Sequence, residues 1–353
     1  MIIKVNTVRA RVWTVDDDGT ADFTFIQDAI DQAENGDAIH VYNGVYYEHL
    51  TISKSIFLFG ESRENTIVDG NGTGTVISIV TNNVTIQRLT VQRSNQSSGT
   101  SFAGIRVSGQ ECNVTGNFVT RNKIGIFLTS HNNEVKENVA TNNGHGVSIY
   151  QSYQNLVESN NFSDNTVGIS LAYSFNNIVR RNRVENSSTG GHGITLSSNS
   201  YNNTIIMNDL TNNYHGMWLS NSHNNSIVEN TVANNELLGI ELASSSDNRF
   251  YHNNFINNPK HVKIDNQTNI WDNSSHGNYW SDYEEKYPNA EEINGSGIWN
   301  TPYDINENNK DNYPLIPEFP SLAITLMVMF LLLFTVLIYK NWNLRNNQST
   351  RCK

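Results

Sequence analysis

Charged residues are scarce in this chain: Asp, Glu, Lys and Arg make up 16% of its 353 residues, whereas soluble domains contain about 25%. Asparagine takes their place and is the commonest residue of the sequence. Its amide competes with the backbone for hydrogen bonds, which makes it costly inside helices and ordinary strands. A fold that repeats one asparagine-containing turn uses the residue well, so the composition favours a repeat solenoid.

Positive charge is also lacking, since the formal net charge is −11. The charged residues among the last residues, 322–353, are all basic, so the preceding part of the chain is more acidic still. Nucleic-acid affinity depends mainly on Lys and Arg that neutralise phosphate. We therefore expect no nucleic-acid partner.

Cysteine is nearly absent. Cys112 lies among the repeats and Cys352 lies beyond the apolar run described below, so the two cannot pair within one chain if that run spans a membrane. A domain with so few thiols fits an oxidising exterior.

The N-terminus, MIIKVNTVRARVW, lacks the apolar core of a signal peptide. Either the true start lies upstream, or the protein is tail-anchored with its bulk in the cytosol. Residues 322–339 (LAITLMVMFLLLFTVLIY) carry no charge, and as a helix they would span about 27 Å, close to the thickness of the hydrocarbon core. Basic residues follow this run and acidic residues precede it, which predicts a single-pass protein of the cell membrane. Its C-terminus would be cytoplasmic and its large domain extracytoplasmic, so we favour an upstream start.

A pattern of glycine, apolar, any residue, apolar recurs at steps of 21 to 25 residues. Alternating apolar residues indicate short strands with one face turned inward. The pattern begins at Gly104, Gly125, Gly146, Gly168, Gly193, Gly216 and Gly239.

Asparagine recurs with the same period in two columns. Cys112 takes the place of the first column in the earliest repeat, with Asn117 five residues later. Stacked coils place equivalent residues about 4.8 Å apart, so each amide can bond its neighbours along a ladder. The first column is Asn133, Asn155, Asn177, Asn203, Asn225 and Asn248, and the second is Asn138, Asn160, Asn182, Asn208, Asn230 and Asn253.

These periods predict an all-β fold: a right-handed parallel β-helix solenoid with coils of about 22 residues, closed by an N-terminal capping helix. Thr24 is the expected N-cap of a helix from Phe25 to Asn35, and Gly36 its C-cap. Strands are expected at 38–42, 51–60, 76–80 and 84–91. The predicted organisation is an extension (1–13), the β-helix with its N-terminal cap (14–264), a C-terminal cap (265–317), a PEFP motif with one transmembrane helix (318–340) and a basic cytoplasmic tail (341–353).

The segment 22–61 and the two repeats resemble the pectin-lyase-like superfamily, and more closely its NosD-like β-helix proteins (CASH domain), abundant in archaea. GNYWSDY (277–283), NTPYDI (300–305) and DNYPL (311–315) resemble the terminal module of archaeal surface-anchored members. PEFP (317–320) resembles an archaeal C-terminal sorting signal. The resemblance implies the fold and display on the cell surface.

Two departures from this pattern matter. The archaeal module commonly carries an acidic glycine-rich stretch suited to calcium, but here Asn294 and Ser296 stand where acids are expected. We therefore predict no calcium cofactor. The basic tail is longer than in the sorting signal, so simple anchoring is the alternative to processing.

One column of planar side chains lies two residues before the first asparagine column. Stacked along the coils, these side chains form either an internal packing stack or, if they face outward, a platform for sugar rings or a partner protein. The column is His131, Tyr153, Phe175, Tyr201 and His223.

The resemblance to NosD implies a part in copper-site assembly, and copper needs His, Cys or Met ligands. His192 and His215 lie on adjacent coils directly before the repeat glycine, but Ile124, Val167 and Leu238 hold the same position elsewhere. We therefore favour a turn-filling role and assign no metal.

Carbohydrate-active relatives use acids on adjacent coils. The equivalent positions here hold charges of both signs, namely Lys136, Glu158 and Arg180, and also Arg183 and Asp209. We interpret them as ion-paired ladders and assign no catalytic residue. The favoured function is a monomeric surface protein that binds carbohydrate or a surface partner without catalysis. A polysaccharide lyase, hydrolase or epimerase and a NosD-like accessory for copper-site assembly stay open.

Overall fold

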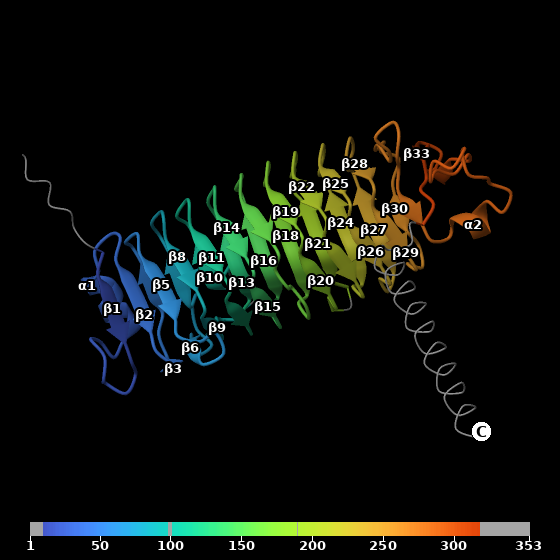
Figure 1. Ribbon diagram of the computed structural model, residues 1–353. Coiled ribbons are helices and arrows are strands. Elements are labelled where there is room, and N and C mark those ends of the chain that lie inside the picture. The colour runs from blue at the N-terminus through green and yellow to red at the C-terminus, as the bar shows by residue number, and fades with distance from the viewer. Residues whose placement is uncertain (1–9, 98–100, 189, 318–353) are drawn as a thin grey trace, which may run out of the picture.

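The chain winds into a stack of coils whose short strands form three parallel sheets along the length of the molecule, which is elongated (Figure 1). This computed structural model describes residues 10–97, 101–188 and 190–317. One coil follows another along the stack, so each strand pairs with the equivalent strand of the next coil. The predicted parallel β-solenoid is confirmed.

Sheet A is continuous along the stack. Its strands are β1 (Val12–Val15), β2 (Ala38–Val41), β5 (Phe57–Gly60), β8 (Thr85–Gln87), β11 (Asn113–Thr115), β14 (Glu134–Lys136), β17 (Leu156–Glu158), β19 (Ile178–Arg180), β22 (Thr204–Ile206), β25 (Ser226–Val228) and β28 (Arg249–Tyr251).

Sheet B has two halves joined by single bridges of Asn161 to Val139 and to Arg183. The first half is β3 (Gly44–Tyr46), β6 (Thr66–Asp69), β9 (Thr90–Gln92), β12 (Phe118–Thr120) and β15 (Val139–Thr141). The second half is β20 (Arg183–Glu185), β23 (Asp209–Thr211), β26 (Thr231–Ala233), β29 (Asn254–Ile256) and β31 (Tyr279–Trp280).

Sheet C contains the glycine repeat and has the longest strands. They are β4 (Leu50–Ile52), β7 (Ile77–Ile79), β10 (Ala103–Val107), β13 (Ile124–Leu128), β16 (His145–Tyr150), β18 (Val167–Ala172), β21 (His192–Ser197), β24 (His215–Ser220), β27 (Leu238–Ala243) and β30 (Val262–Ile264). The predicted strand 51–60 is therefore two strands, β4 and β5, which belong to different sheets.

The apolar residues of each repeat fill the interior of the stack. Ile126 and Leu128 of β13, like their equivalents in neighbouring coils, are fully buried, and burying each such side chain stabilises the fold by about 1.5–3 kcal/mol. The glycine at the start of each repeat is required for a steric reason. A Cβ at Gly146, for example, would lie 2.6 Å from the carbonyl oxygen of Gly168 and 3.0 Å from Asn165 Nδ2. Glycine thus lets adjacent coils and their asparagines approach.

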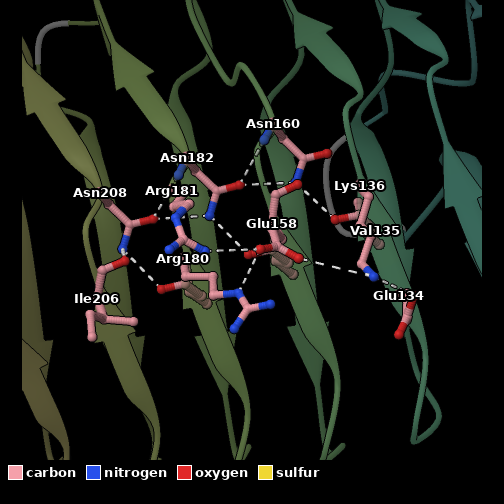
Figure 2. A network of polar contacts seen from close by, with 12 residues as sticks. Glu134, Val135, Lys136, Glu158, Asn160, Arg180, Arg181, Asn182, Ile206 and Asn208 are labelled. Atoms are coloured by element: carbon pink, nitrogen blue, oxygen red, sulfur yellow. Dashed lines mark hydrogen bonds and ion pairs between the residues drawn. The ribbon is translucent and has the colours of Figure 1, made fainter.

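Asparagine side chains connect the coils at every corner. In each of the two predicted columns the Oδ1 atom accepts the backbone N–H of the preceding coil's asparagine, as from Asn155 to Asn177 (3.0 Å) and from Asn160 to Asn182 (3.0 Å). The Nδ2 groups continue the ladder, as from Asn182 to Asn208 (2.9 Å; Figure 2). These bonds satisfy backbone groups that the turns would otherwise bury unpaired.

A third ladder, absent from the sequence interpretation, runs ten residues after the first. Ser187 replaces asparagine in one coil of it, and the Ser187 backbone N–H donates to Asn213 Oδ1 (3.1 Å). Its other members are Asn122, Asn143, Asn165, Asn235 and Asn258.

The N-terminal cap differs from the prediction. Helix α1 runs over Ile26–Gln32, shorter than the expected Phe25 to Asn35, and no side chain at its N-cap bonds the first turn. The expected capping role of Thr24 is wrong, because the Glu48 carboxylate accepts the N–H groups of Ile26 (2.8 Å) and Gln27 (2.9 Å) from the following coil. The helix also ends before the expected C-cap at Gly36.

The C-terminal cap ends the ladders. The hairpin of β32 (Tyr303–Asn306) and β33 (Asn309–Asp311), with the short helix α2 (Tyr283–Lys286), follows the last coil. Asn309 Oδ1 accepts the N–H of Asn269, the last member of the first ladder (2.9 Å), and Asp311 Oδ2 accepts that of Asn278, the last member of the second (2.7 Å). Side chains two residues apart in β33 thus close both ladders.

No helix of the described residues is long and apolar enough to cross a membrane. The predicted transmembrane helix, the PEFP motif beyond Pro317 and the basic tail, residues 318–353, lie outside those residues.

Candidate functional site

The predicted column of planar side chains is assembled at the turns between sheet C and sheet A. Ring centroids lie 3.7 Å apart for His131 and Tyr153, 4.9 Å for Tyr153 and Phe175, and 5.0 Å for Phe175 and Tyr201. His223 continues the column through a backbone bridge to Tyr201, and its Nδ1 lies 3.1 Å from Ser246 Oγ.

These rings lie at an outer corner of the stack, partly exposed to solvent. They are nearly parallel, with interplanar angles of 17°, 18° and 5°. The faces between His131, Tyr153, Phe175 and Tyr201 are therefore closed. The edges of these rings, and Tyr201 at the end of this stack, meet the solvent.

Two tyrosines beside the column present more of their rings. Tyr150 is 37% exposed and Tyr173 is 52% exposed, and Tyr201 within the column is 36% exposed. Tyr150 and Tyr173 meet edge to face at 5.8 Å. We call Tyr150, Tyr173 and Tyr201 the tyrosine surface.

Sequence reasoning missed Tyr150 and Tyr173, because neither belongs to a column. The positions aligned with Tyr150 hold Ala172 and Ser197. The sequence therefore contains no periodic pattern that would identify these two tyrosines. They come together only because they lie at successive turns of the solenoid.

The charged residues of sheet A pair across coils (Figure 2). Glu158 Oε1 lies 2.7 Å from Arg180 Nε and 3.4 Å from Arg181 Nη1, and Glu158 Oε2 lies 4.0 Å from Lys136 Nζ. The hydrogen bond from Arg180 holds the pKa of Glu158 below its usual value. A carboxylate held in this way is a structural partner and a poor proton acceptor.

The expected pairing of Arg183 with Asp209 is wrong. The two residues are register partners on adjacent coils, but the Arg183 guanidinium instead lies 2.7 Å from Glu185 Oε2 on its own strand. Burial raises the pKa of the Asp209 carboxyl.

The two candidate metal-binding histidines are brought together on the outer face of sheet C. The ring centroids of His192 and His215 lie 5.0 Å apart, and His192 stacks on Trp218 at 5.2 Å. Both Nδ1 atoms, and Nε2 of His215, are buried without a hydrogen-bond partner, although His215 Nδ1 lies 3.4 Å from Glu241 Oε2. Burial, with the neighbouring His215, lowers the pKa of His192 to about 4, so this imidazole is neutral at neutral pH.

A metal centre needs more ligands than this pair supplies. Lys263 Nζ lies 2.6 Å from the carboxylate of Glu241 and competes for it. Across residues 10–97, 101–188 and 190–317, no group of three or more His, Cys, Asp or Glu side chains is arranged to hold a metal ion. The residues present thus fit two imidazole ligands and no complete metal site.

Three parallel sheets wound around a single core, with ladders at their corners, define a parallel β-solenoid of the right-handed β-helix class. The profile of one family, described as periplasmic copper-binding protein (NosD), matches residues 80–285. The match covers more than half of the chain, which therefore belongs to the NosD family. No curated protein matches the chain in sequence.

Solved structures share the fold at low identity. XylC in complex with xylose has a TM-score of 0.59 at 10% identity, over 82% of this chain and 88% of that one. Alginate lyase from Paenibacillus sp. str. FPU-7 has a TM-score of 0.53 at 13% identity, over 74% of this chain and 97% of that one. The Dettilon tailspike protein has a TM-score of 0.56 at 14% identity, over 69% of this chain and 55% of the tailspike. This chain thus spans about half the length of that tailspike, and at these identities the likeness concerns the fold alone.

Proposed function

We propose that this NosD-family protein is anchored to the cell membrane by its C-terminal apolar run, with its β-helix outside the cell, and binds carbohydrate there without transforming it. The tyrosine surface carries this proposal. Its rings project from successive turns of a rigid solenoid, and a flat ring that is partly dehydrated offers an apolar face to the C–H groups of a sugar.

Rigidity favours this function. Tyr150, Tyr173 and Tyr201 stand beside ladder turns whose backbones are fixed by buried hydrogen bonds such as that from Asn177 to Asn203 (3.0 Å). A surface that is ordered before binding loses little conformational entropy when a ligand arrives. Rings contributed by successive coils suit an extended chain of repeating sugar units along the stack.

The proposal includes the absence of catalysis, and the ion pairs of the acidic side chains support this. Glu158 and Glu241 each contact cations within 4.0 Å, so neither is poised as a general acid or base. Two features support the outside location: the family description is periplasmic, and acidic residues precede the apolar run while basic residues follow it.

The test is a glycan-binding and cleavage screen with the full chain in detergent micelles. We expect saturable binding to at least one polysaccharide, without new reducing or unsaturated ends. Tyr150→Ala combined with Tyr173→Ala should abolish it, whereas Tyr47→Ala, which removes a ring that is 66% exposed elsewhere, should leave it unchanged. Binding that survives the double substitution, or release of cleaved product, would refute the proposal.

Copper delivery is the second candidate function, favoured by the unpartnered nitrogens of His192 and His215. Neutral imidazoles suit copper, which would here be cargo. The expected observation is stoichiometric copper binding by the full chain, lost in His192→Ala and His215→Ala but kept in His252→Ala. Binding that is indifferent to the first two substitutions would remove this candidate.

A further inference from the structure

A pocket lies where the last coil meets the C-terminal cap, away from the tyrosine surface. It encloses about 280 Å³, somewhat below the volume typical of sites for drug-sized ligands, and so suits a single small unit. The chemically active side chains of its lining are Lys260, His261, Asp282, Lys286, Tyr303 and Asp304.

The carboxylates of this pocket are already engaged. Asp282 accepts the Tyr303 hydroxyl at 3.0 and 3.1 Å, and its Oδ1 lies 3.2 Å from His261 Nε2. Asp304 Oδ1 lies 3.1 Å from Lys310 Nζ. Each acid therefore has its ion-pair partner outside the two lysines of the pocket.

The two lysines of the pocket form no ion pair with its carboxylates, which pair with His261 and Lys310 instead. Lys286 Nζ donates to the carbonyl oxygen of Asp304 (2.5 Å) and lies 3.8 Å from the centroid of the Tyr303 ring. Lys260 forms no ion pair with any residue that the structure describes. Burial lowers the pKa of Lys286, and the nearby charges of Asp282 and Asp304 only partly offset this effect. A bound anion would stabilise the ammonium further.

We propose that this pocket binds the carboxylate of an acidic sugar residue, a uronate unit of a polysaccharide or a free uronic acid. Lys260 and Lys286 would hold the carboxylate, since charge-assisted hydrogen bonds are the strong ones. Asn258 also lines the pocket, but its amide already bonds Asn235, the Val232 carbonyl and His261, so recognition rests on the two lysines. This site is distinct from the tyrosine surface and does not depend on it.

The test is titration of the full chain in detergent, followed by calorimetry and by NMR of the His261 ring. The probes are glucuronate, galacturonate, glucose, acetate, an acidic peptide and a uronate-containing polysaccharide. We expect the uronates to bind and glucose and acetate to bind at least about tenfold more weakly. The polysaccharide should bind if the unit is recognised within a chain, and only the free acid should bind if it is not.

Two lysine variants test the residues. Lys260→Met and Lys286→Met should each weaken uronate binding about tenfold or more, whereas Lys123→Met, a control lysine in the repeats, should not. Because Lys286 also supports the hairpin, thermal melting is followed, and Lys260→Met tests the site without that complication. Uronate binding that is unaffected by both variants, equal binding of glucose, or tighter binding of the acidic peptide would overturn the inference.

The experiments distinguish failure of this proposal from failure of the proposal that the tyrosine surface binds carbohydrate. Tyr150→Ala with Tyr173→Ala should leave uronate binding at this pocket intact. If the tyrosine surface binds no glycan while uronate binding still depends on Lys260, the surface proposal fails and this one stands.

Discussion

Replacing Asn182 by alanine tests how much one ladder member stabilises the stack. The Asn182 Oδ1 atom accepts the Asn160 backbone N–H (3.0 Å) and Nδ2 group (2.9 Å), while its own Nδ2 donates to the carbonyl of Val157 (2.9 Å) and to Asn208 Oδ1 (2.9 Å). Alanine leaves the Asn160 N–H without this acceptor and the Val157 carbonyl without this donor. Both sites are buried, and an unsatisfied buried group costs about 1–3 kcal/mol. The free energy of unfolding should therefore fall by about 2–6 kcal/mol, a large share of the about 5–15 kcal/mol of a typical domain.

The assay is denaturant unfolding of the full chain followed by circular dichroism, with hydrogen exchange of the amides in the coils on either side. The control is Asn254→Ala on the outer side of β29, where the asparagine is exposed and the expected change is within about 0.5 kcal/mol. Equal stability of the two variants would refute the argument that ladder bonds hold the coils together.

Two further predictions concern the ends of the stack. Burial raises the pKa of Asp311 from its ordinary value of 3.8 to about 6, so the folded protein binds this proton more tightly than the unfolded chain. The contribution of Asp311 to stability should be greatest below about pH 4 and decline by about 3 kcal/mol as pH rises through 6. Urea titrations of the protein and of Asp311→Asn at several pH values measure this contribution as the difference between the two, and a difference that moves in favour of the native aspartate over that interval would contradict the prediction. At the other end, Glu48→Ala removes the acceptor of two first-turn N–H groups of α1 and should cost about 0.5–2 kcal/mol, with faster amide exchange in α1. Thr24→Ala should change neither quantity, and equal effects of the two substitutions would restore Thr24 as the cap.

The sequence specifies the coils well because their signals are periodic. The glycine repeat and the two asparagine columns have constant spacing, so register follows from counting, and the ladders through Asn155 and Asn160 are found where the columns place them. The third ladder had a signal too, a fixed offset of ten residues from the first. Ser187 interrupts that column, which makes it less visible.

The caps and surfaces depend on contacts between residues far apart in sequence. Glu48 caps α1 from 22 residues away, whereas the local signal pointed to Thr24. Asp311 closes the second ladder from 33 residues beyond Asn278, and no repeat predicts that distance. The pocket combines His261 with two cap residues, Lys286 and Tyr303. Local sequence patterns could not predict it, because these residues are also far apart in the sequence.

Coil register is the claim on which the tyrosine surface and the cap pocket rest, and engineered disulfides test it most directly. Ser148 and Ser170 are register partners on adjacent strands of sheet C, so their Cα atoms should lie about 4.8 Å apart, within the range that a disulfide bridges. Thr195 is the partner of Ser170 one coil further on, about 9.6 Å from Ser148. On mild oxidation of the full chain, Ser148→Cys with Ser170→Cys should form the bond readily, and Ser148→Cys with Thr195→Cys should not. Bonding of the second pair in preference to the first would contradict the stacked register.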